Sequence, residues 1–597
     1  MSESQNLIKP TLLAWFFFIT IASLSFLRFS SDYLGPDNDD VMRLVQVRDW
    51  LAGQSWFDLT QYRLGPESGT LMHWSRLVDL PIAGLINFFS LFFSGQTAEE
   101  IAVYIWPLVT AIPVILGFIL CARAIAGPQN IAIGAIAAVA FLFGVGKFNP
   151  GSIDHHNVQL AIYAVLIFIV IDPNRSWKLH VLAGFLCALA IAIGAETTPL
   201  IAAICVIIAV TWAWYGGKDY RRPTRAFALS MAFSLTMLFF ITVPSARYIE
   251  VVCDTLSLGY YALGIAGSGL LFLAAATLSY KSRFIRVASL VGIAAITFAL
   301  AKIVAPECLQ SPLANLDPLL TELWLDNITE AQSFLAQWRA KPLSIFGFYA
   351  VPVLAITFCI FQLRTADHRD IYLKLLFVII IASGISLIQI RGSIFANLAA
   401  MIPMVFLVSQ LRMKNREEPK NLKIGISFII ISLLSMPIIW AVIGDGISQL
   451  NNFVIARSNN TNLAVQDEND KNACQTHAAL SPLNKLPKSV VVAPSNLGAS
   501  ILRYTHHHIL SAPYHRNQSG MLAEIKASIS TNNEAREILN EANATILVFC
   551  NTDPQVSVSK RKAPDGFYAN MSNGEVPDFL KPLELSTSQA LVFYEIN

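Results

Sequence analysis

The stretch IAIGAIAAVAFLFGVGKFNPGSIDHH, from Ile131 to His156, carries a long apolar run into an acidic motif, Asp154-His155-His156. An apolar run of this kind is typical of a membrane-spanning helix. A second example lies near the N-terminus, where the run from Leu12 to Leu27 leads to Asp37-Asn38-Asp39-Asp40. Carboxylates are costly at a bilayer boundary unless they hold a cation or a polar substrate. Two such motifs on one side of a membrane therefore indicate a metal-assisted site.

The composition indicates that lipid surrounds most of the chain. Of its 597 residues, 54% are hydrophobic and only 14% are charged, whereas soluble domains are about a quarter charged. The net charge of +2 predicts no general attraction to nucleic acid. We therefore expect a polytopic α-helical membrane protein with membrane lipid, and no nucleic acid, among its partners.

Thirteen apolar runs are long enough to span a bilayer, which needs roughly 17–25 residues. A further run at 77–94 is interrupted by Asp79 and Pro81 and is predicted to be an interfacial helix. The predicted spans are 11–29, 101–125, 129–147, 155–171, 180–196, 198–215, 224–244, 256–279, 285–304, 343–362, 370–390, 392–411 and 422–444.

The distribution of basic residues predicts the orientation of these spans. With the N-terminus inside, the short outer connections hold only Lys147, Arg247 and Arg391. The short inner connections are basic throughout, as the positive-inside rule requires, and the C-terminal tail then lies outside. The inner basic residues are Arg123, Arg175, Lys178, Lys218, Arg221, Arg222, Arg225, Lys281, Arg283, Arg286, Arg364, Arg369, Lys374, Arg412, Lys414, Arg416, Lys420 and Lys423.

The eight cysteines divide between the spans and the outer segments. Cys253, Cys308, Cys474 and Cys550 all fall in outer segments, and an even set on one side indicates disulfides in an oxidising compartment. The simplest pairing is Cys253–Cys308 and Cys474–Cys550, with free thiols as the alternative. The other four cysteines lie in or at the ends of spans and are expected to be packing residues.

The chain is expected to divide into a membrane domain, residues 1–444, and a C-terminal periplasmic domain, residues 445–597. The membrane domain has long outer loops at 30–100 and 305–342. A polar stretch from Asn451 to Asn472 is predicted to be a linker or hinge. Alternating strands and helices then predict a small α/β domain, with strands at 489–493, 508–511, 544–549 and 591–594 and a helix at 522–542.

Each acidic motif has both a metal-binding and a structural explanation. Neighbouring carboxylates such as Asp39 and Asp40 suit Mg²⁺ or Mn²⁺, but Asp and Asn also cap helices. Asp154 and His156 could both reach an ion at the start of a helix, or Asp154 could be a capping residue beside interfacial histidines. Glu330 alone is most simply a solvated residue. Arg391 lies at the outer mouth between two spans, where a guanidinium suits a phosphate.

Together these residues resemble a known family. Asn38-Asp39 followed by Arg48-Asp49-Trp50-Leu51-Ala52-Gly53 resembles the first-loop acidic motif of oligosaccharyltransferase catalytic subunits. Asp154-His155-His156 is similar to their second acidic motif, especially in archaeal members. Ile328-Thr329-Glu330 falls where the family keeps a glutamate in its fifth outer loop, and Arg391 where it keeps a pyrophosphate-binding arginine. Thirteen spans with an outer C-terminal domain also resemble this branch of the GT-C glycosyltransferases.

The resemblance implies roles for these residues. Asp39, Asp154, His156 and Glu330 would hold a divalent metal, Mn²⁺ or Mg²⁺, and Asp39, Asp154 and Glu330 would be the catalytic acids. Arg391 would bind the phosphate of the donor, while Asp40 and His155 would support the metal ligands. Arg63, His73 and Arg76 are weaker candidates for phosphate contact, with ordinary loop solvation as the alternative.

The tail departs from the family pattern. Sequon-reading oligosaccharyltransferases carry a Trp-Trp-Asp motif there, but the last tryptophan of this chain is Trp440. The resemblance therefore does not extend to recognition of an Asn-x-Ser/Thr acceptor. Residues 512–517 form a polar loop that includes Tyr514, His515 and Arg516; it could bind a sugar or phosphate, or be a turn with internal hydrogen bonds. The triplet His506-His507-His508 is predicted to be strand-edge surface, because adjacent strand residues point to opposite faces.

The resulting hypothesis is a GT-C glycosyltransferase in a bacterial inner membrane. It would transfer a sugar or oligosaccharide from a polyprenyl-phosphate or polyprenyl-pyrophosphate donor to a periplasmic acceptor, which could be a glycan, a lipid or a protein. One alternative is a transporter or flippase for a lipid-linked saccharide, although acids at one surface and no visible repeat argue against transport. Another alternative is a polymerase or ligase that needs no metal.

Overall fold

The computed structural model describes residues 7–66, 68–310, 313–365, 369–459, 473–585 and 590–597. The chain divides into two compact units. The first unit comprises Met1–Ser30, Ser75–Pro312 and Glu330–Thr461, and the second comprises Ser31–Trp74, Leu313–Thr329 and Asn462–Asn597. The second unit thus includes outer-loop segments that the sequence analysis placed in the membrane domain.

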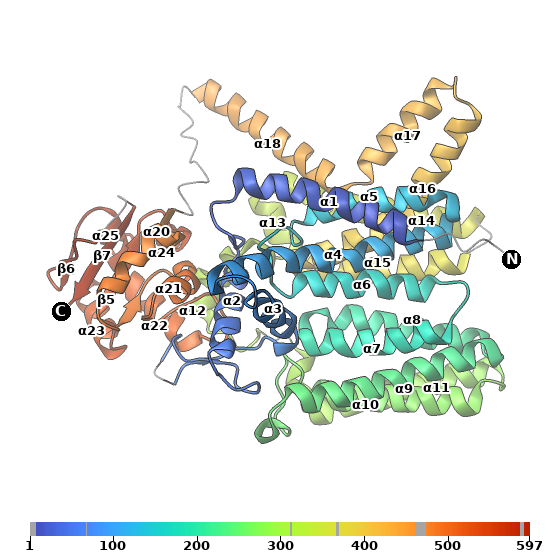
Figure 1. Cartoon of the computed structure of the whole chain (residues 1–597), viewed down its shortest axis with the longest axis horizontal. Helices are drawn as coiled ribbons and strands as arrows, with labels where there is room; N and C mark the ends of the chain where they lie inside the picture. Colours follow the sequence, from blue (N-terminus) through green and yellow to red (C-terminus); the bar gives the residue numbers. More distant parts are fainter. Residues whose placement is uncertain (1–6, 67, 311–312, 366–368, 460–472, 586–589) are drawn as a thin grey trace. The chain divides into compact units, whose positions relative to one another are not determined.

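The first unit is a bundle of long apolar helices (Figure 1). Helix α7 packs along α9, α10 lies beside α9 and α11, and α4 lies against α5 and α6. The helices are α1 (Ile8–Phe29), α3 (Arg76–Phe89), α4 (Gly95–Ala126), α5 (Ile131–Val145), α6 (His156–Ile171), α7 (Trp177–Ile193), α8 (Thr198–Tyr215), α9 (Gly217–Thr242), α10 (Leu258–Leu278), α11 (Arg283–Val304), α13 (Phe334–Ala340), α14 (Ile345–Thr365), α15 (Arg369–Ile388), α16 (Ser393–Glu417), α17 (Leu422–Leu434) and α18 (Pro437–Asn459).

Many of these helices are apolar on the faces that they expose. Within the described residues, ten helices are long and apolar enough to cross a membrane, or eleven if one bent pair counts as a span. Helices α6 and α7 are shorter and apolar. In α11, only 6% of the most apolar 18-residue window is buried, and Phe284 and Ile303 are exposed. A helix that is apolar and unburied requires lipid as its solvent, so the chain is a multi-pass membrane protein.

Every predicted span falls on an apolar helix, and the exact number of crossings stays a prediction. The span predicted at 422–444 is not one straight helix. It consists of α17 and the beginning of α18, which are bent by 82° at a short break (Figure 1). Pro437 is the first residue of α18; because it has no backbone N–H, it is suited to a helix start rather than to a helix interior.

The segment predicted to be interfacial forms α3, a helix of 14 residues. Its first turn contains a buried ion pair between Arg76 and Asp79, with 3.1 Å between Arg76 Nη1 and Asp79 Oδ2. Arg76 thus forms an ion pair within its own helix, whereas the alternative considered for it was simple solvation in a loop. A helix of about 14 residues rises about 21 Å, which is shorter than the bilayer core.

The second unit contains a five-stranded sheet with the order β4-β3-β5-β7-β6. Strand β3 pairs in parallel with β4 and β5, whereas β7 pairs antiparallel with β5 and β6. All five residues of β5 are buried, as expected for a central strand covered on both faces. The strands are β3 (Val490–Val492), β4 (His508–Ile509), β5 (Ile546–Cys550), β6 (Leu580–Pro582) and β7 (Leu591–Ile596).

Short helices complete the tail. They are α20 (His477–Leu480), α21 (Gly498–Tyr504), α22 (Gln518–Ile529), α23 (Asn532–Glu541), α24 (Pro554–Lys562) and α25 (Phe567–Ser572). The α/β class predicted for the tail is confirmed, but three details were wrong. The helix predicted at 522–542 is two helices, because Thr531 caps a new one, and strand β6 was not predicted. Helix α18 runs to Asn459, well into the predicted linker. The linker residues 460–472 lie outside the described chain.

Residues 31–74 of the first outer loop belong to the second unit and pair with the tail. This loop contains α2 (Asn38–Leu51) and a small hairpin of β1 (Thr60–Gln61) and β2 (Thr70–Leu71). Arg503 donates to both carboxylate oxygens of Asp32, at 2.5 and 2.9 Å. Burial alone would raise the pKa of Asp32, but hydrogen bonds from Arg503 and Tyr504 lower it. A charged, bidentate pair of this kind joins distant segments firmly.

The second long loop also supplies an element to this unit. Leu316, Leu320 and Leu323, on and before α12 (Pro318–Leu323), form one buried cluster with Met521 and Ile525 of α22. The apolar face of a six-residue helix is thereby buried, which such a short helix needs in order to persist.

The four cysteines predicted to lie in outer segments form two disulfides, one in each unit. Cys253 is joined to Cys308 and Cys474 to Cys550. Cys121, Cys187, Cys205 and Cys359 are free and are buried or half-buried.

Candidate metal centre

The loop between α5 and α6 presents the second acidic motif. Gly146 ends α5 with φ +69°, and Gly151 has φ +93°, values that favour glycine. Asn157 anchors the loop from the next helix, donating from Nδ2 to the Ser152 carbonyl at 3.0 Å. The chain therefore reaches the first turn of α6 with Asp154 and both histidines buried.

The side chains of Asp154, His155 and His156 lie close together. His155 Nδ1 is 2.5 Å from Asp154 Oδ1, and His156 Nε2 is 3.5 Å from Asp154 Oδ2. Ligand atoms of all three residues lie within 4.8 Å of one another. Two atoms about 3.5 Å apart can both lie near 2.1 Å from one cation, so Asp154 Oδ2 and His156 Nε2 suit a shared metal ion.

The structure adds a residue that the sequence analysis missed. Glu196, in the short turn Ala195–Thr197 between α7 and α8, accepts hydrogen bonds through Oε1 from His155 Nε2 at 2.6 Å and Gln159 Nε2 at 2.9 Å. One signal was available. Glu196 is the last residue of the span predicted at 180–196, at the same predicted outer side as Asp154, and acids there are expensive.

Arg391 lies near this cluster, as its position between α15 and α16 implied. Its Nε donates to Gln389 Oε1 at 3.1 Å, and its guanidinium lies within electrostatic range of Glu196. The first unit thus brings together Asp154, His155, His156, Glu196 and the charge of Arg391 at one end of its helices.

Glu330 is in a more open position. Its side chain is 58% exposed, and Lys147 Nζ is 3.7 Å from Glu330 Oε1. This environment matches the solvated residue considered as the alternative, and a metal-binding role for Glu330 stays a prediction.

The first acidic motif lies in the second unit, where Asp37 does cap a helix. Its Oδ1 accepts from the Asp39 backbone N–H at 3.1 Å, at the start of α2. Asp39 is half-buried in the first turn and Asp40 is buried. The capping explanation therefore holds for Asp37. The metal-binding role of Asp39 and the supporting role of Asp40 stay predictions.

The tail loop 512–517 contacts the first outer loop within the second unit. Tyr514 donates from its hydroxyl to the Asn38 carbonyl at 2.8 Å, and its ring lies edge-on to Trp74. Arg516 Nη1 is 3.4 Å from the carbonyls of Leu71 and Met72. These contacts match the alternative explanation, a turn with hydrogen bonds internal to the fold, and a ligand-binding role for the loop stays a prediction.

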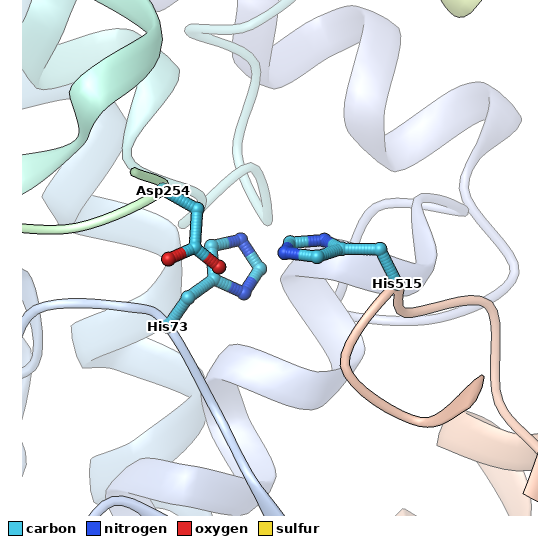
Figure 2. A group of neighbouring side chains, drawn as sticks. All are labelled: His73, Asp254 and His515. Atoms are coloured by element: carbon cyan, nitrogen blue, oxygen red, sulfur yellow. The ribbon is translucent and has the colours of Figure 1, made fainter. Parts of the chain in front are cut away.

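His515 and His73 form an imidazole pair in the same unit. Their ring centroids are 4.5 Å apart, and Figure 2 shows the two rings side by side. Asp254, also labelled in Figure 2, belongs to the first unit. The pair brings together His515, from the loop considered for sugar or phosphate binding, and His73, a weaker candidate for phosphate contact.

Arg63 and His507 both form hydrogen bonds within the second unit. Arg63 donates to the carbonyls of Thr505 and Leu502 at 2.8 and 2.9 Å, so it supports the C-terminal end of α21. His507 is completely buried, contrary to the surface position predicted for the triplet. It accepts from Ser489 N–H at Nδ1 and donates from Nε2 to the Leu483 carbonyl, which compensates its burial.

Comparison with known proteins identifies the fold. No protein-family model and no curated protein sequence matches the chain. A crystal structure of the Archaeoglobus fulgidus oligosaccharyltransferase, tethered to an acceptor peptide, matches all of this chain and 74% of its own, with a TM-score of 0.65 and 12% identity. The chain has an oligosaccharyltransferase fold.

A second structure of that archaeal enzyme, AglB, supports the same conclusion. It was solved with an inhibitory peptide and a dolichol-phosphate, and it matches 98% of this chain and 74% of its own, with a TM-score of 0.64 and 11% identity. At this identity the match describes the path of the backbone. The predicted resemblance to the oligosaccharyltransferase branch of GT-C enzymes is therefore confirmed at the level of the fold.

Proposed function

We propose that this chain is a membrane glycosyltransferase that transfers a sugar or oligosaccharide from a polyprenyl-linked phosphate donor to an acceptor at the outer face of a bacterial inner membrane. The observation that carries the proposal is the pair Asp154 Oδ2 and His156 Nε2, 3.5 Å apart at one end of the helices in an oligosaccharyltransferase fold.

The residues present fit a divalent metal. A carboxylate oxygen and an imidazole nitrogen are ligands that Mn²⁺ accepts readily, and both side chains are buried. Asp39 and Glu330 are proposed to contribute further oxygens. When bound, such an ion neutralises negative charge on a transferring group and helps to orient the reactants. A crystal structure of the archaeal enzyme, which matches 91% of this chain with a TM-score of 0.59 and 13% identity, contains zinc and sulfate.

Arg391 is proposed to bind the donor phosphate. It is half-buried at the end of α15, beside the acidic cluster. A guanidinium can donate two parallel hydrogen bonds to phosphate oxygens. The dolichol-phosphate in a structure of the archaeal enzyme supports a lipid-linked donor. The residue would hold the leaving phosphate where negative charge develops during transfer.

The acceptor is proposed to be a periplasmic glycan, lipid or protein. The archaeal enzyme was solved with acceptor and inhibitory peptides, but the tail of this chain contains no tryptophan with which to form a Trp-Trp-Asp motif. We therefore propose a binding mode that differs from sequon recognition. The loop with Tyr514, His515 and Arg516 is the candidate surface for acceptor contact.

The outer location is supported by charge and by the cysteines. The short connections on the opposite side carry the basic residues, and both disulfides lie on the proposed outer side, which agrees with an oxidising periplasm.

The test is transfer activity of the purified full-length protein with added Mn²⁺. Asp154→Ala and Asp39→Ala are expected to reduce glycan transfer by at least 100-fold, because each removes a proposed metal ligand. Asp172→Asn is the matched control, since Asp172 is a buried acid at the other end of α6, and it should transfer at nearly the wild-type rate. Unchanged turnover by a folded Asp154→Ala protein would contradict the metal assignment.

A further inference from the structure

Glu196, in the turn between α7 and α8, contacts two residues beside the candidate metal ligands. One oxygen, Oε1, accepts from both His155 Nε2 and Gln159 Nε2, which come from the residue before α6 and from its first turn. Each of these partners touches a different candidate metal ligand. Glu196 therefore reaches both ligands through two separate paths.

The first path runs through His155 to Asp154. Both ring nitrogens of His155 face carboxylate oxygens, Nε2 toward Glu196 and Nδ1 toward Asp154 Oδ1. His155 therefore bridges the two carboxylates. This bond holds one oxygen of Asp154 and leaves Oδ2 turned toward His156 Nε2.

The second path runs through Gln159 to His156. Because Gln159 donates to Glu196 from Nε2, its amide oxygen is the atom that faces His156 Nδ1, at 3.1 Å. An amide oxygen only accepts, so His156 Nδ1 carries the proton. The lone pair is then on Nε2, which is the nitrogen 3.5 Å from Asp154 Oδ2.

We propose that Glu196 is a positioning residue that orients both metal ligands at once, Asp154 through His155 and His156 through Gln159. The inference rests on the proposed metal site. In this arrangement the orientation of the Asp154 carboxylate and the tautomer of His156 both depend on Glu196, which lies between α7 and α8. Partners of this kind raise the affinity of a metal site without touching the metal.

Gly194 provides the space that this arrangement needs. A Cβ at this position would lie 2.8 Å from Gln159 Nε2. Its backbone is extended, with φ −169°, so alanine can adopt the same conformation. Gly194→Ala should therefore displace the Gln159 amide from Glu196 while the backbone keeps its path.

The experiment measures Mn²⁺ affinity of the full-length, metal-free protein by electron paramagnetic resonance titration. Glu196→Gln is expected to bind Mn²⁺ 10- to 100-fold more weakly, the usual range for losing such a supporting partner. Glu196→Asp keeps the charge and should recover part of the affinity. Glu250→Gln is the matched control, because Glu250 pairs with Arg247 on the surface, and it should bind as the wild type does.

A second pair of variants tests the paths themselves. Gly194→Ala should weaken Mn²⁺ binding severalfold, and it serves as the deciding variant if Glu196→Gln does not fold. His155→Asn combined with Glu196→Gln should lose less affinity than the product of the two single losses, because both act on one path.

The outcomes separate this inference from the function on which it rests. If the wild-type protein does not bind Mn²⁺, the metal assignment fails and this inference fails with it. If the wild type binds Mn²⁺ but folded Glu196→Gln and Gly194→Ala bind it equally well, the metal assignment stands and the positioning role is overturned.

Discussion

His155 and His156 are adjacent in sequence but use their ring nitrogens in opposite ways. His155 has both nitrogens against carboxylate oxygens, from Asp154 and Glu196. His156 has one nitrogen against the Gln159 amide oxygen and directs the other toward Asp154 Oδ2. Since successive residues at a helix start point in different directions, one histidine can support a ligand while its neighbour supplies one.

Arg391 allows a residue-level test of donor binding. Arg391→Lys keeps the positive charge but removes the planar fork, so the KM for the lipid-linked donor should rise by about tenfold, equivalent to about 1.4 kcal/mol. Steady-state kinetics with varied donor concentration would measure this change. Arg412→Lys, on the predicted inner side of the membrane, is the control; an equal KM for Arg391→Lys and wild type would contradict phosphate binding by Arg391.

At the scale of elements, the tail shows how a local cap overrides an apolar pattern. The run from Leu522 to Ala542 is helical nearly throughout, but Ser530 and Thr531 interrupt it. Thr531 accepts from the Glu534 backbone N–H, and Glu534 accepts from the Thr531 backbone N–H, forming a capping box. The new helix can therefore leave in another direction, so that Ala535 and Leu539 enter the buried core of the tail.

The capping box predicts a measurable contribution to stability. Thr531→Ala removes the side-chain acceptor and should destabilise α23 by about 1 kcal/mol. Hydrogen exchange of α23 amides in the full-length protein would report the loss as faster exchange. Thr531→Ser retains the hydroxyl and should exchange nearly as the wild type does, whereas equal exchange in Thr531→Ala would show that the cap contributes little.

At the scale of the whole molecule, each compact unit has its own disulfide and its own buried ionisable groups. The core of the tail contains Glu524, which is completely buried and accepts from Gln555 Nε2. Burial raises the pKa of Glu524 from 4.5 to about 8. Burial likewise raises the pKa of Asp553 from 3.8 to about 6. The second unit therefore holds protons that its unfolded chain would release.

This difference predicts how stability depends on pH. Between pH 4.5 and about 8 the folded unit keeps the Glu524 proton that the unfolded chain has lost. Stability must therefore fall as pH rises through this window, by up to about 1.4 kcal/mol per pH unit, and level off above it. Hydrogen exchange of β3 and β5 amides from pH 5 to 9, corrected for intrinsic rates, would measure the effect.

Glu524→Gln is the variant that isolates this contribution. A glutamine stays neutral at every pH and can still accept from Gln555, so the pH dependence above about pH 6 should flatten. Exposed Glu541→Gln is the control and should keep the wild-type slope. A slope unchanged in Glu524→Gln would assign the dependence to another group.

Sequence patterns predicted the parts of this protein that depend on local properties. Hydropathy along about 20 residues located the apolar helices, and residue periodicity located the strands β3, β4, β5 and β7. The positions of Asp154, His156 and Arg391 at helix ends followed in the same way, because a charged residue must lie where a span stops. Strand β6 was missed because it has only three residues and ends in Pro582. Proline cannot donate a hydrogen bond to a neighbouring strand, so it is rare inside strands and is found mainly at sheet edges.

Only the tertiary structure decided which groups meet. Glu196 is 41 residues from His155 and 37 from Gln159, and nothing in the local sequence pairs them. His507 is buried only because the Leu483 carbonyl and the Ser489 N–H satisfy its ring. Hydropathy acts on each segment separately, whereas hydrogen bonds depend on the placement of two segments at once. The sequence by itself therefore determined a membrane bundle with Asp154 and His156 at a helix start, and the packing of helix ends decided that Glu196 meets His155 and Gln159.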